Sequence, residues 1–382
     1  MPVGERDLAI DKALTELCGL TPFLSLVTPV NVPEARAAFL AGDEPEFEYR
    51  PLPDLDDLQA RLDAIRPEEA SDPAIASMAT SLVRHLNDRL EMLRHRDSER
   101  FFLISVEMFG HVDEGTYELA SRLLEEKPAK GGERSTVSAE EFAEAARREL
   151  DSYRDAYPEM AAEVLISSSV PGVMVESGNL QVGSDVRIGR DRVDPLIQHE
   201  VGTHIVTFEN GRSQPLHMLS HGLAGYDELQ EALGVLAEHL AGGIPPSRLR
   251  VLAYRVMAAH LRAEGAEFRE TFDRLLEWGC SRRVAFSTVM RAYRSGGMTK
   301  DAIYLRGLVK LLDYLARGAS LEPLFVGKIS FEAVPLIFDL MERRVLNEPP
   351  LKPRFLERSS ARQRLTEIQR GVGVEEIGGL AA

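Results

Sequence analysis

Histidine and glutamate residues near the middle of the chain have the types and spacing of a metal site. Five of the nine histidines fall between His199 and His239, and two of them frame the segment Gln198-His-Glu-Val-Gly-Thr-His204. Neutral imidazoles bind zinc, and a carboxylate directly after the first histidine can reach a metal-bound water as general base. The segment therefore predicts a hydrolytic zinc site with His199 and His204 as ligands and Glu200 as the catalytic base.

The spacing of these two histidines is unusual. On a regular α-helix, residues four apart lie about 40° apart around the axis, whereas residues five apart lie about 140° apart. His199 and His204 can share a metal only if the helix widens locally into a π-type turn, a distortion that recurs at functional sites. Gly202 lies between them and lowers the resistance to this distortion. We therefore expect a π-bulge here; the alternative is an accidental pair of helix histidines.

A third ligand is expected from the next amphipathic helix. Glu231 lies 27 residues after His204, in the segment Tyr226-Asp-Glu-Leu-Gln-Glu-Ala-Leu-Gly234. Glu228 and Glu238 are alternatives, about one and two helical turns away. Three protein ligands would leave a fourth position open for water, which is the pattern of a catalytic rather than a structural zinc site. We expect one Zn²⁺ per chain.

Peptide hydrolysis would need further groups around such a metal. The oxyanion that develops during hydrolysis requires a donor besides the metal. The candidates between the two metal helices are His217, His221 and Tyr226, which could equally be ordinary polar loop residues. The extended segments Val173–Glu176 and Asn179–Gly183 could pair with a peptide backbone, as edge strands do.

An enzyme that removes terminal residues must also bind a free carboxylate, for which a bidentate Arg is best suited. The segment 245–310 is basic, with 13 Lys and Arg against 6 Asp and Glu. Its candidates for substrate binding are Arg291, Arg294, Lys300, Tyr304 and Arg306. We favour Lys300 and Arg306 within Met298-Thr-Lys-Asp-Ala-Ile-Tyr-Leu-Arg-Gly307. The alternative is that each is a structural or solvated charge.

The elements that must position these residues are mostly helices. Hydrophobic periodicity predicts helices over 33–40, 54–65, 72–94, 194–208, 226–241, 247–263, 266–278, 281–294, 299–317 and 331–343. A capping box at Ser138-Ala-Glu-Glu141, after the loop 127–136, opens a further helix to about Tyr157. β-branched segments predict strands over 164–169, 172–176 and 180–188. We expect an α+β fold with a helical N-terminal region (1–160), a zinc catalytic region (161–345) and a loosely held polar tail (346–382).

Composition narrows the class of protein. The 382 residues carry a formal net charge of −16, which disfavours binding to nucleic acid and to anionic membranes. Two cysteines, Cys18 and Cys280, cannot build a disulfide framework. The chain shows no signal peptide and no long apolar run, so we expect a cytoplasmic protein. No serine-hydrolase elbow or dinucleotide-binding glycine motif is present, and segment 130–136 only faintly echoes a phosphate-binding loop.

Several separated motifs together resemble one known family. It is the microtubule-associated tyrosine carboxypeptidase (MATCAP) family, whose bacterial members are labelled flavohaemoglobin expression-modulating QEGLA-motif proteins. The resemblance runs from about Val30 to Leu356. Its motifs are His199–His204, Gln230-Glu231, Gly172–Ser184, Asn210-Gly211, Met298–Asp301 with Tyr304–Gly307, and Gly327–Ser330.

The resemblance implies a zincin-like metallopeptidase with an HExxxH helix that cleaves C-terminal tyrosine. His199, His204 and Glu231 would be the zinc ligands and Glu200 the catalytic base. One departure is that the family's QEGLA reads Gln230-Glu-Ala-Leu-Gly234 here, so the packing around the glutamate is expected to differ.

The sequence thus predicts a zinc-dependent carboxypeptidase that acts on a peptide or protein C-terminus. The runner-up is a non-enzymatic regulatory protein that retains a structural zinc site. Glu200 favours catalysis, because a structural site has no use for a carboxylate that is not a ligand. A helical protein without any metal would need the histidine cluster and Glu231 to coincide by chance. Because tubulin is acidic and this chain is too, we expect no stable microtubule binding.

Overall fold

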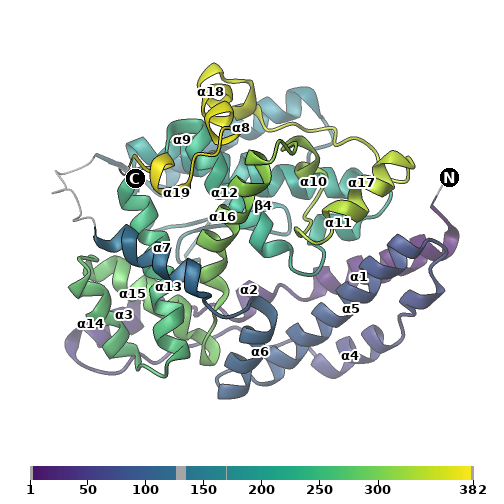
Figure 1. Ribbon diagram of the computed structural model, residues 1–382. Coiled ribbons are helices and arrows are strands. Elements are labelled where there is room, and N and C mark those ends of the chain that lie inside the picture. Colours follow the sequence, from purple (N-terminus) through teal and green to yellow (C-terminus); the bar gives the residue numbers. More distant parts are fainter. Residues whose placement is uncertain (1–2, 126–134, 169, 380–382) are drawn as a thin grey trace.

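The computed structural model describes residues 3–125, 135–168 and 170–379. Most of these residues are helical and two small sheets complete the fold (Figure 1), which confirms the expected α+β class. The expected loop 127–136 lies almost entirely outside the described residues, as does Ser169 at the end of the first predicted strand. Buried apolar side chains from Ile10 to Ile377 form one contiguous core.

The N-terminal region is helical, as predicted. Its α-helices are α1 (Glu5–Leu20), α2 (Phe23–Leu26), α3 (Val32–Ala41), α4 (Leu55–Asp63), α5 (Pro73–Arg94), α6 (Glu99–Phe109), α7 (Glu114–Glu125) and α8 (Ala139–Ala156). Asp72 caps α5 by accepting a hydrogen bond from the Ala74 amide at 2.9 Å. The predicted capping box opens α8, because Ser138 and Glu141 each accept a hydrogen bond from the other's backbone amide.

The main sheet has three short strands in the order β2 (Val164–Ser167), β4 (Asn179–Gly183), β3 (Val173–Glu176). β4 lies in the centre, parallel to β2 and antiparallel to β3, with Val173 opposite Val182. The expectation that β4 could pair with a peptide is therefore wrong, because both of its edges are already used. β3 remains an edge strand. The predicted strand 180–188 ends early, and its last residue belongs to β5 (Ile188–Gly189), which pairs with β1 (Thr136–Val137).

The second half of the chain wraps around one buried helix. After the sheet come α9 (Val193–His199), the π-helical turn η3 (Glu200–Ile205), α10 (Val206–Ser213), α11 (Met218–His221), α12 (Tyr226–Gly242), α13 (Pro246–Ala263), α14 (Phe268–Glu277), α15 (Arg282–Tyr293), α16 (Ile303–Ala316), α17 (Val334–Glu342), α18 (Ser359–Ile368) and α19 (Val374–Ile377). α12 lies near the centre beside α9 and α16 (Figure 1), and most of its residues are buried.

The first helix and the C-terminal segment both reach this central part. Asp11 of α1 accepts hydrogen bonds from the amides of His217 and Met218, at 2.9 and 2.8 Å, where α11 begins. The C-terminal segment differs from the loosely held tail that we expected. Arg358 pairs with Asp194 of α9, and α18 packs against α12 with Ile368 fully buried. Apolar residues are sparse in this charged segment, so its sequence does not predict that it packs against the rest of the protein.

None of the helices within the described part of the chain is long and apolar enough to cross a membrane.

Candidate metal centre

The predicted helix over 194–208 contains the π-type distortion that the histidine spacing required. α9 ends at His199, and η3 widens the helix over Glu200–Ile205 before α10 continues it. The widening brings the rings of His199 and His204 to 5.0 Å between centroids. Gly202 lies inside the turn, where a Cβ atom would lie 2.7 Å from Oε1 of Gln198. Glycine therefore fits both the distortion and the tight packing around it.

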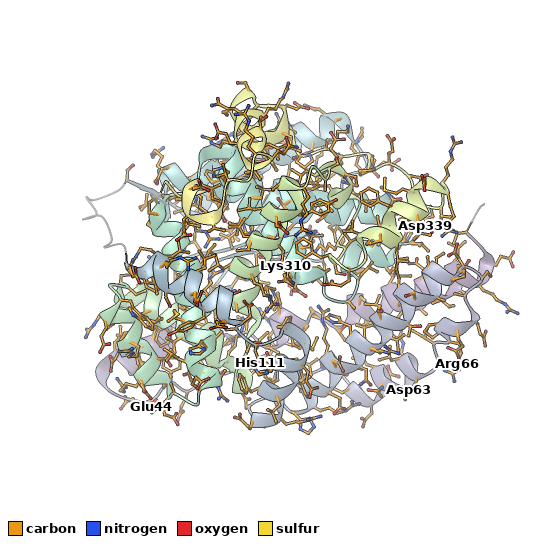
Figure 2. All side chains as sticks on the ribbon, viewed as in Figure 1. Glu44, Asp63, Arg66, His111, Lys310 and Asp339 are labelled. Atoms are coloured by element: carbon orange, nitrogen blue, oxygen red, sulfur yellow. The ribbon has the colours of Figure 1, made fainter. Side chains whose placement is uncertain are left out.

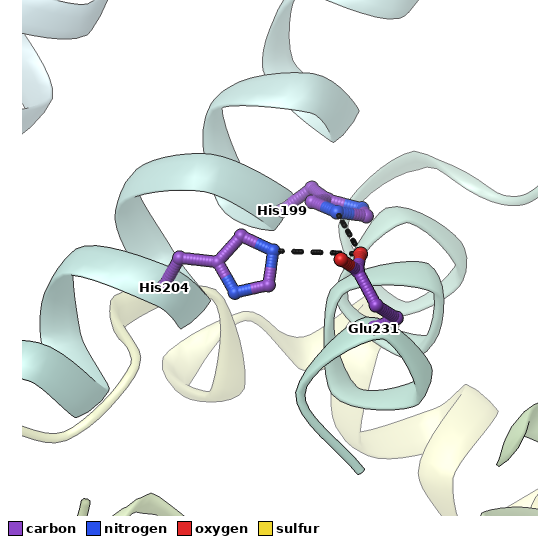
Figure 3. A group of neighbouring side chains, drawn as sticks. All are labelled: His199, His204 and Glu231. Atoms are coloured by element: carbon purple, nitrogen blue, oxygen red, sulfur yellow. Dashed lines mark ion pairs between the residues drawn. The ribbon is translucent and has the colours of Figure 1, made fainter. Parts of the chain in front are cut away.

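α12 supplies the third side chain of the cluster, as predicted for Glu231. Its Oε2 lies 3.6 Å from Nε2 of His199 and 3.8 Å from Nε2 of His204 (Figure 3). Donors around a tetrahedral zinc at about 2.0–2.2 Å are separated by roughly 3.4 Å, so these spacings suit one ion. The donor atoms of these three residues all lie within 4.8 Å of one another. The structure thus offers a candidate metal triad of two histidines and one carboxylate.

The outer ring nitrogens of both histidines have partners that fix the orientation of the rings. Nδ1 of His199 lies 2.8 Å from Oε1 of Glu238, which is fully buried. Nδ1 of His204 lies 3.4 Å from Oε1 of Gln230, which also accepts a hydrogen bond from Thr207 at 2.8 Å. Such partners hold metal-binding histidines in the required tautomer and orientation.

The two glutamates that were alternatives to Glu231 as the third ligand, Glu228 and Glu238, have other partners in the structure. Glu228 faces the other way and pairs with Arg306 at 2.6 Å and with Lys310 at 2.9 Å; Lys310 is labelled in Figure 2. Glu238 supports His199 from behind and is itself paired with Arg192 and Arg248. Among the described residues only Glu231 completes a cluster with both histidines.

The small residue of the Gln230-Glu-Ala-Leu-Gly234 segment has a specific packing role. A Cβ atom on Gly234 would lie 2.6 Å from Nε2 of His199, so a larger residue would displace the ring. In QEGLA the glycine is the third residue, whereas here it is the fifth. Gly234 therefore lies directly against the ring of His199, a candidate ligand.

A cleft of about 180 Å³ opens over this triad. It is lined by the edge strand β3 and the residues just before it. Basic side chains from α15, from the segment between α15 and α16, and from the loop before α17 also line it. Glu200 also lines the cleft. Its carboxylate makes no hydrogen bond or ion pair within the described residues, and burial raises its pKa above the ordinary value.

The chain matches the family model described as microtubule-associated tyrosine carboxypeptidase over residues 38–372. It belongs to this family. Microtubule-associated tyrosine carboxypeptidase 1 of Mus musculus and that of Homo sapiens are 27% and 28% identical to it over 187 residues. The aligned part covers 45% of this chain and only 38% of either relative. No solved structure matches the chain.

In this tyrosine carboxypeptidase family member, the predicted substrate residues divide into two groups. Arg291, Lys300 and Tyr304 line the cleft, as does the oxyanion candidate Tyr226. Arg306, His217 and His221 do not belong to its lining. Arg306 instead donates a hydrogen bond to the Phe109 carbonyl at 2.8 Å and pairs with Glu228.

Two of the predicted substrate residues in the cleft have their charge balanced by the protein. Arg291 holds Asp301 through Nε and Nη2, with Nη2 2.7 Å from Oδ1. Nζ of Lys300 lies 3.1 Å from Asp227 and 3.3 Å from Oε1 of Glu231. Burial alone would lower the pKa of Lys300, but Asp227 and Glu231 outweigh it and raise the pKa above the ordinary value. Lys300 therefore stabilises the triad carboxylate.

Two basic residues of the cleft, Lys328 and Arg294, are not among those favoured from the sequence. Lys328 lies in the Gly327–Ser330 motif, and burial lowers its pKa to about 8. Arg294 lies in the basic stretch but outside the motif that we favoured. The family-like motif was a signal for Lys328; nothing in the sequence distinguishes Arg294 from its basic neighbours.

Proposed function

We propose that the protein is a zinc-dependent carboxypeptidase that removes a C-terminal, tyrosine-like residue from a peptide or protein. The observation that carries the proposal is the metal triad at the base of a cleft, with Glu200 beside it and free of any described partner. The family and the relatives that the chain matches are described as tyrosine carboxypeptidases, which supports the reaction class.

The donor set fits zinc. Two imidazoles and one carboxylate leave a fourth position facing the cleft, which is the arrangement of catalytic zinc sites in zincin-like enzymes. When bound there, zinc would polarise a carbonyl and lower the pKa of a water molecule. Glu238 and Gln230 would keep the two imidazoles oriented with Nε2 toward the ion.

Glu200 would move the proton. Its carboxylate would take a proton from the attacking water and later give it to the amine of the leaving residue. The raised pKa of this buried carboxyl suits a group that must both accept and release a proton near neutral pH. Of the three predicted oxyanion donors, Tyr226 lines the cleft and remains the candidate.

β3 would bind the substrate backbone. It is an edge strand with Val173, Met174 and Val175 along the cleft, so a peptide could add to it as a further strand. Hydrogen bonds to a strand edge are independent of the substrate's side chains, so this contact would hold peptides of varied sequence.

The test begins with the zinc content of protein purified without a histidine tag or added metal. We expect about one zinc per chain. The protein should also shorten peptides ending in tyrosine by one residue, as measured by mass spectrometry. The Glu200→Gln variant should keep its zinc and lose at least about 10²-fold in turnover.

Two results would argue against this proposal. Zinc without cleavage of any peptide in a C-terminal library would favour the regulatory alternative, in which the metal is structural. Wild-type turnover by Glu200→Gln would remove the proposed base from the mechanism.

A further inference from the structure

The basic side chains of the cleft differ in whether the protein balances their charge. Arg291 and Lys300 are ion-paired with neighbouring carboxylates, as described above. Arg294 and Lys328 have no ion pair with any carboxylate of the described residues. Nζ of Lys328 lies over the rings of Phe208 and Tyr226, 5.6 and 5.9 Å from their centroids. Within the described residues, Arg294 makes neither an ion pair nor a cation–π contact of this kind.

The guanidinium of Arg294 is buried yet incompletely bonded. The residue is 4% exposed, and Nη1 donates a hydrogen bond to Oγ1 of Thr28 at 2.7 Å. Nε is buried without a partner, and Nη2 makes no hydrogen bond within the described residues. Burial of a charge without compensation is costly, and here it lowers the pKa of Arg294 to about 10. An anion bound in the cleft would supply the counter-charge and the hydrogen-bond acceptors that this guanidinium lacks.

The unbonded edge of Arg294 has the shape of a carboxylate site. Nε and Nη2 form the same edge through which Arg291 holds Asp301 and Arg248 holds Glu238. Two parallel N–H groups match the two oxygens of one carboxylate, which a lysine ammonium cannot do. Arg294 lines the cleft and retains, unbonded, the edge that Arg291 and Arg248 use to bind carboxylates.

The hydroxyl of Thr28 and the backbone at Ser295 fix the position of the Arg294 side chain. Thr28 donates its own hydroxyl proton to the Leu24 carbonyl at 2.6 Å, which leaves its oxygen to accept from Arg294. The next residue, Ser295, has a positive φ of 58° and donates its amide to the Tyr49 hydroxyl at 2.7 Å. Strained backbone of this kind persists where the surroundings fix it, and it is frequent at functional sites.

We infer that Arg294 binds the terminal α-carboxylate of the substrate through its Nε–Nη2 edge, with Thr28 as its positioning residue. This inference rests on the proposed carboxypeptidase function, because the same cleft contains the metal triad and Arg294. The site would select chains with a free C-terminus and reject internal peptide bonds. Arg294 replaces the two residues favoured from the sequence, because Lys300 is ion-paired with neighbouring carboxylates, and Arg306 does not line the cleft.

The test compares two peptides of identical sequence ending in tyrosine, one with a free carboxylate and one with a C-terminal amide. The measured quantity is the ratio of kcat/KM for the acid to kcat/KM for the amide, which does not depend on the fraction of folded protein. The wild type should prefer the acid. Arg294→Gln should lower this ratio by roughly 10- to 100-fold, the range for a charge-assisted hydrogen-bonded pair. Arg294→Lys should restore only part of it.

A matched control is Arg283→Gln, which removes an exposed arginine from α15 and should leave the ratio unchanged. If the wild type prefers the acid and Arg294→Gln keeps that preference, the inference is overturned while the carboxypeptidase function stands. If the wild type cleaves neither peptide, the proposed function fails. In that case, the affinities of the acid and amide peptides for Glu200→Gln and for Glu200→Gln/Arg294→Gln test separately whether Arg294 binds the carboxylate. Equal acid binding by both would overturn the inference.

Discussion

Glu231 and Glu238 lie two turns apart on α12, both approach His199, and yet they have different surroundings. Glu231 faces the cleft: its Oε1 contacts Lys300 and its Oε2 contacts both histidines. Glu238 is fully buried, and both of its oxygens are occupied by His199, Arg192 and Arg248. One ammonium group leaves an oxygen of Glu231 available to a metal, whereas two guanidinium groups leave Glu238 none.

The two carboxylates also illustrate how burial is offset. Burial alone would raise the pKa of each, but neighbouring cations reverse the effect and hold both pKa values well below the ordinary one. The largest opposing contribution comes from Lys300 at Glu231 and from Arg248 at Glu238. Cations outside α12, Lys300 at Glu231 and Arg248 at Glu238, therefore decide which carboxylate keeps an oxygen free for a metal, and the sequence of α12 alone does not determine it.

The largest effect is expected for Glu231→Gln. A neutral amide is a poor zinc ligand, so the purified variant should contain far less than one zinc per chain and have no measurable peptidase activity. Metal analysis of protein at equal concentrations measures this. Retention of one zinc per chain would mean that Glu231 is not a ligand and does not differ from Glu238 in that respect.

A smaller loss of metal is expected for Glu238→Gln. Loss of a carboxylate behind a ligand histidine typically lowers metal affinity about 10- to 100-fold, as chelator competition would measure. Because Arg192 and Arg248 would lose their buried counter-charge, the free energy of unfolding should also fall by about 3 kcal/mol. Glu228→Gln is the control on the same helix and should keep zinc affinity. Equal zinc affinities in the two variants would contradict a supporting role for Glu238.

Gly234→Ala tests the close contact between α12 and the His199 ring, at a position between Glu231 and Glu238 in the sequence. The added Cβ would press on the His199 ring, so we expect a destabilisation of about 1–3 kcal/mol and weaker zinc binding. Urea unfolding and the same chelator competition measure the two effects. Gly115→Ala in α7 is the matched control, because its Cβ would meet nothing closer than 3.5 Å. That variant should be neutral or up to about 1 kcal/mol more stable.

The smallest effect concerns His239, next to Glu238. Its ring is buried, and burial lowers its pKa from 6.5 to about 4. Below pH 6.5 the unfolded chain therefore binds a proton that the folded protein does not, so stability falls as the pH drops toward 4. His239→Gln should reduce the stability lost between pH 7 and pH 5 by up to about 2 kcal/mol. An unchanged acid sensitivity in urea unfolding would show that His239 does not contribute.

The clustering of the candidate triad could be predicted from the sequence because its geometry imposes a local rule. Two histidines five apart can meet only across a widened turn, and η3 is that turn. The role of Glu238 as the support for His199 could not be predicted in the same way, since it depends on the ion pair between Glu238 and Arg248 of another helix. Lys300 and Arg306 belong to one motif, yet α16 begins between them and directs Arg306 to Glu228. Proximity in a motif was therefore a poor guide to position in the cleft.

The bridge made by Arg358 has a consequence for the order in which the protein matures. Asp194 and the Ala241 carbonyl, its two contacts, precede it in the chain by 164 and 117 residues. During synthesis from the N-terminus, the helices that carry the candidate metal triad therefore emerge long before Arg358 does. The contacts of Arg358 with α9 and α12 can therefore form only after both helices have left the ribosome, so they belong to the late steps of folding.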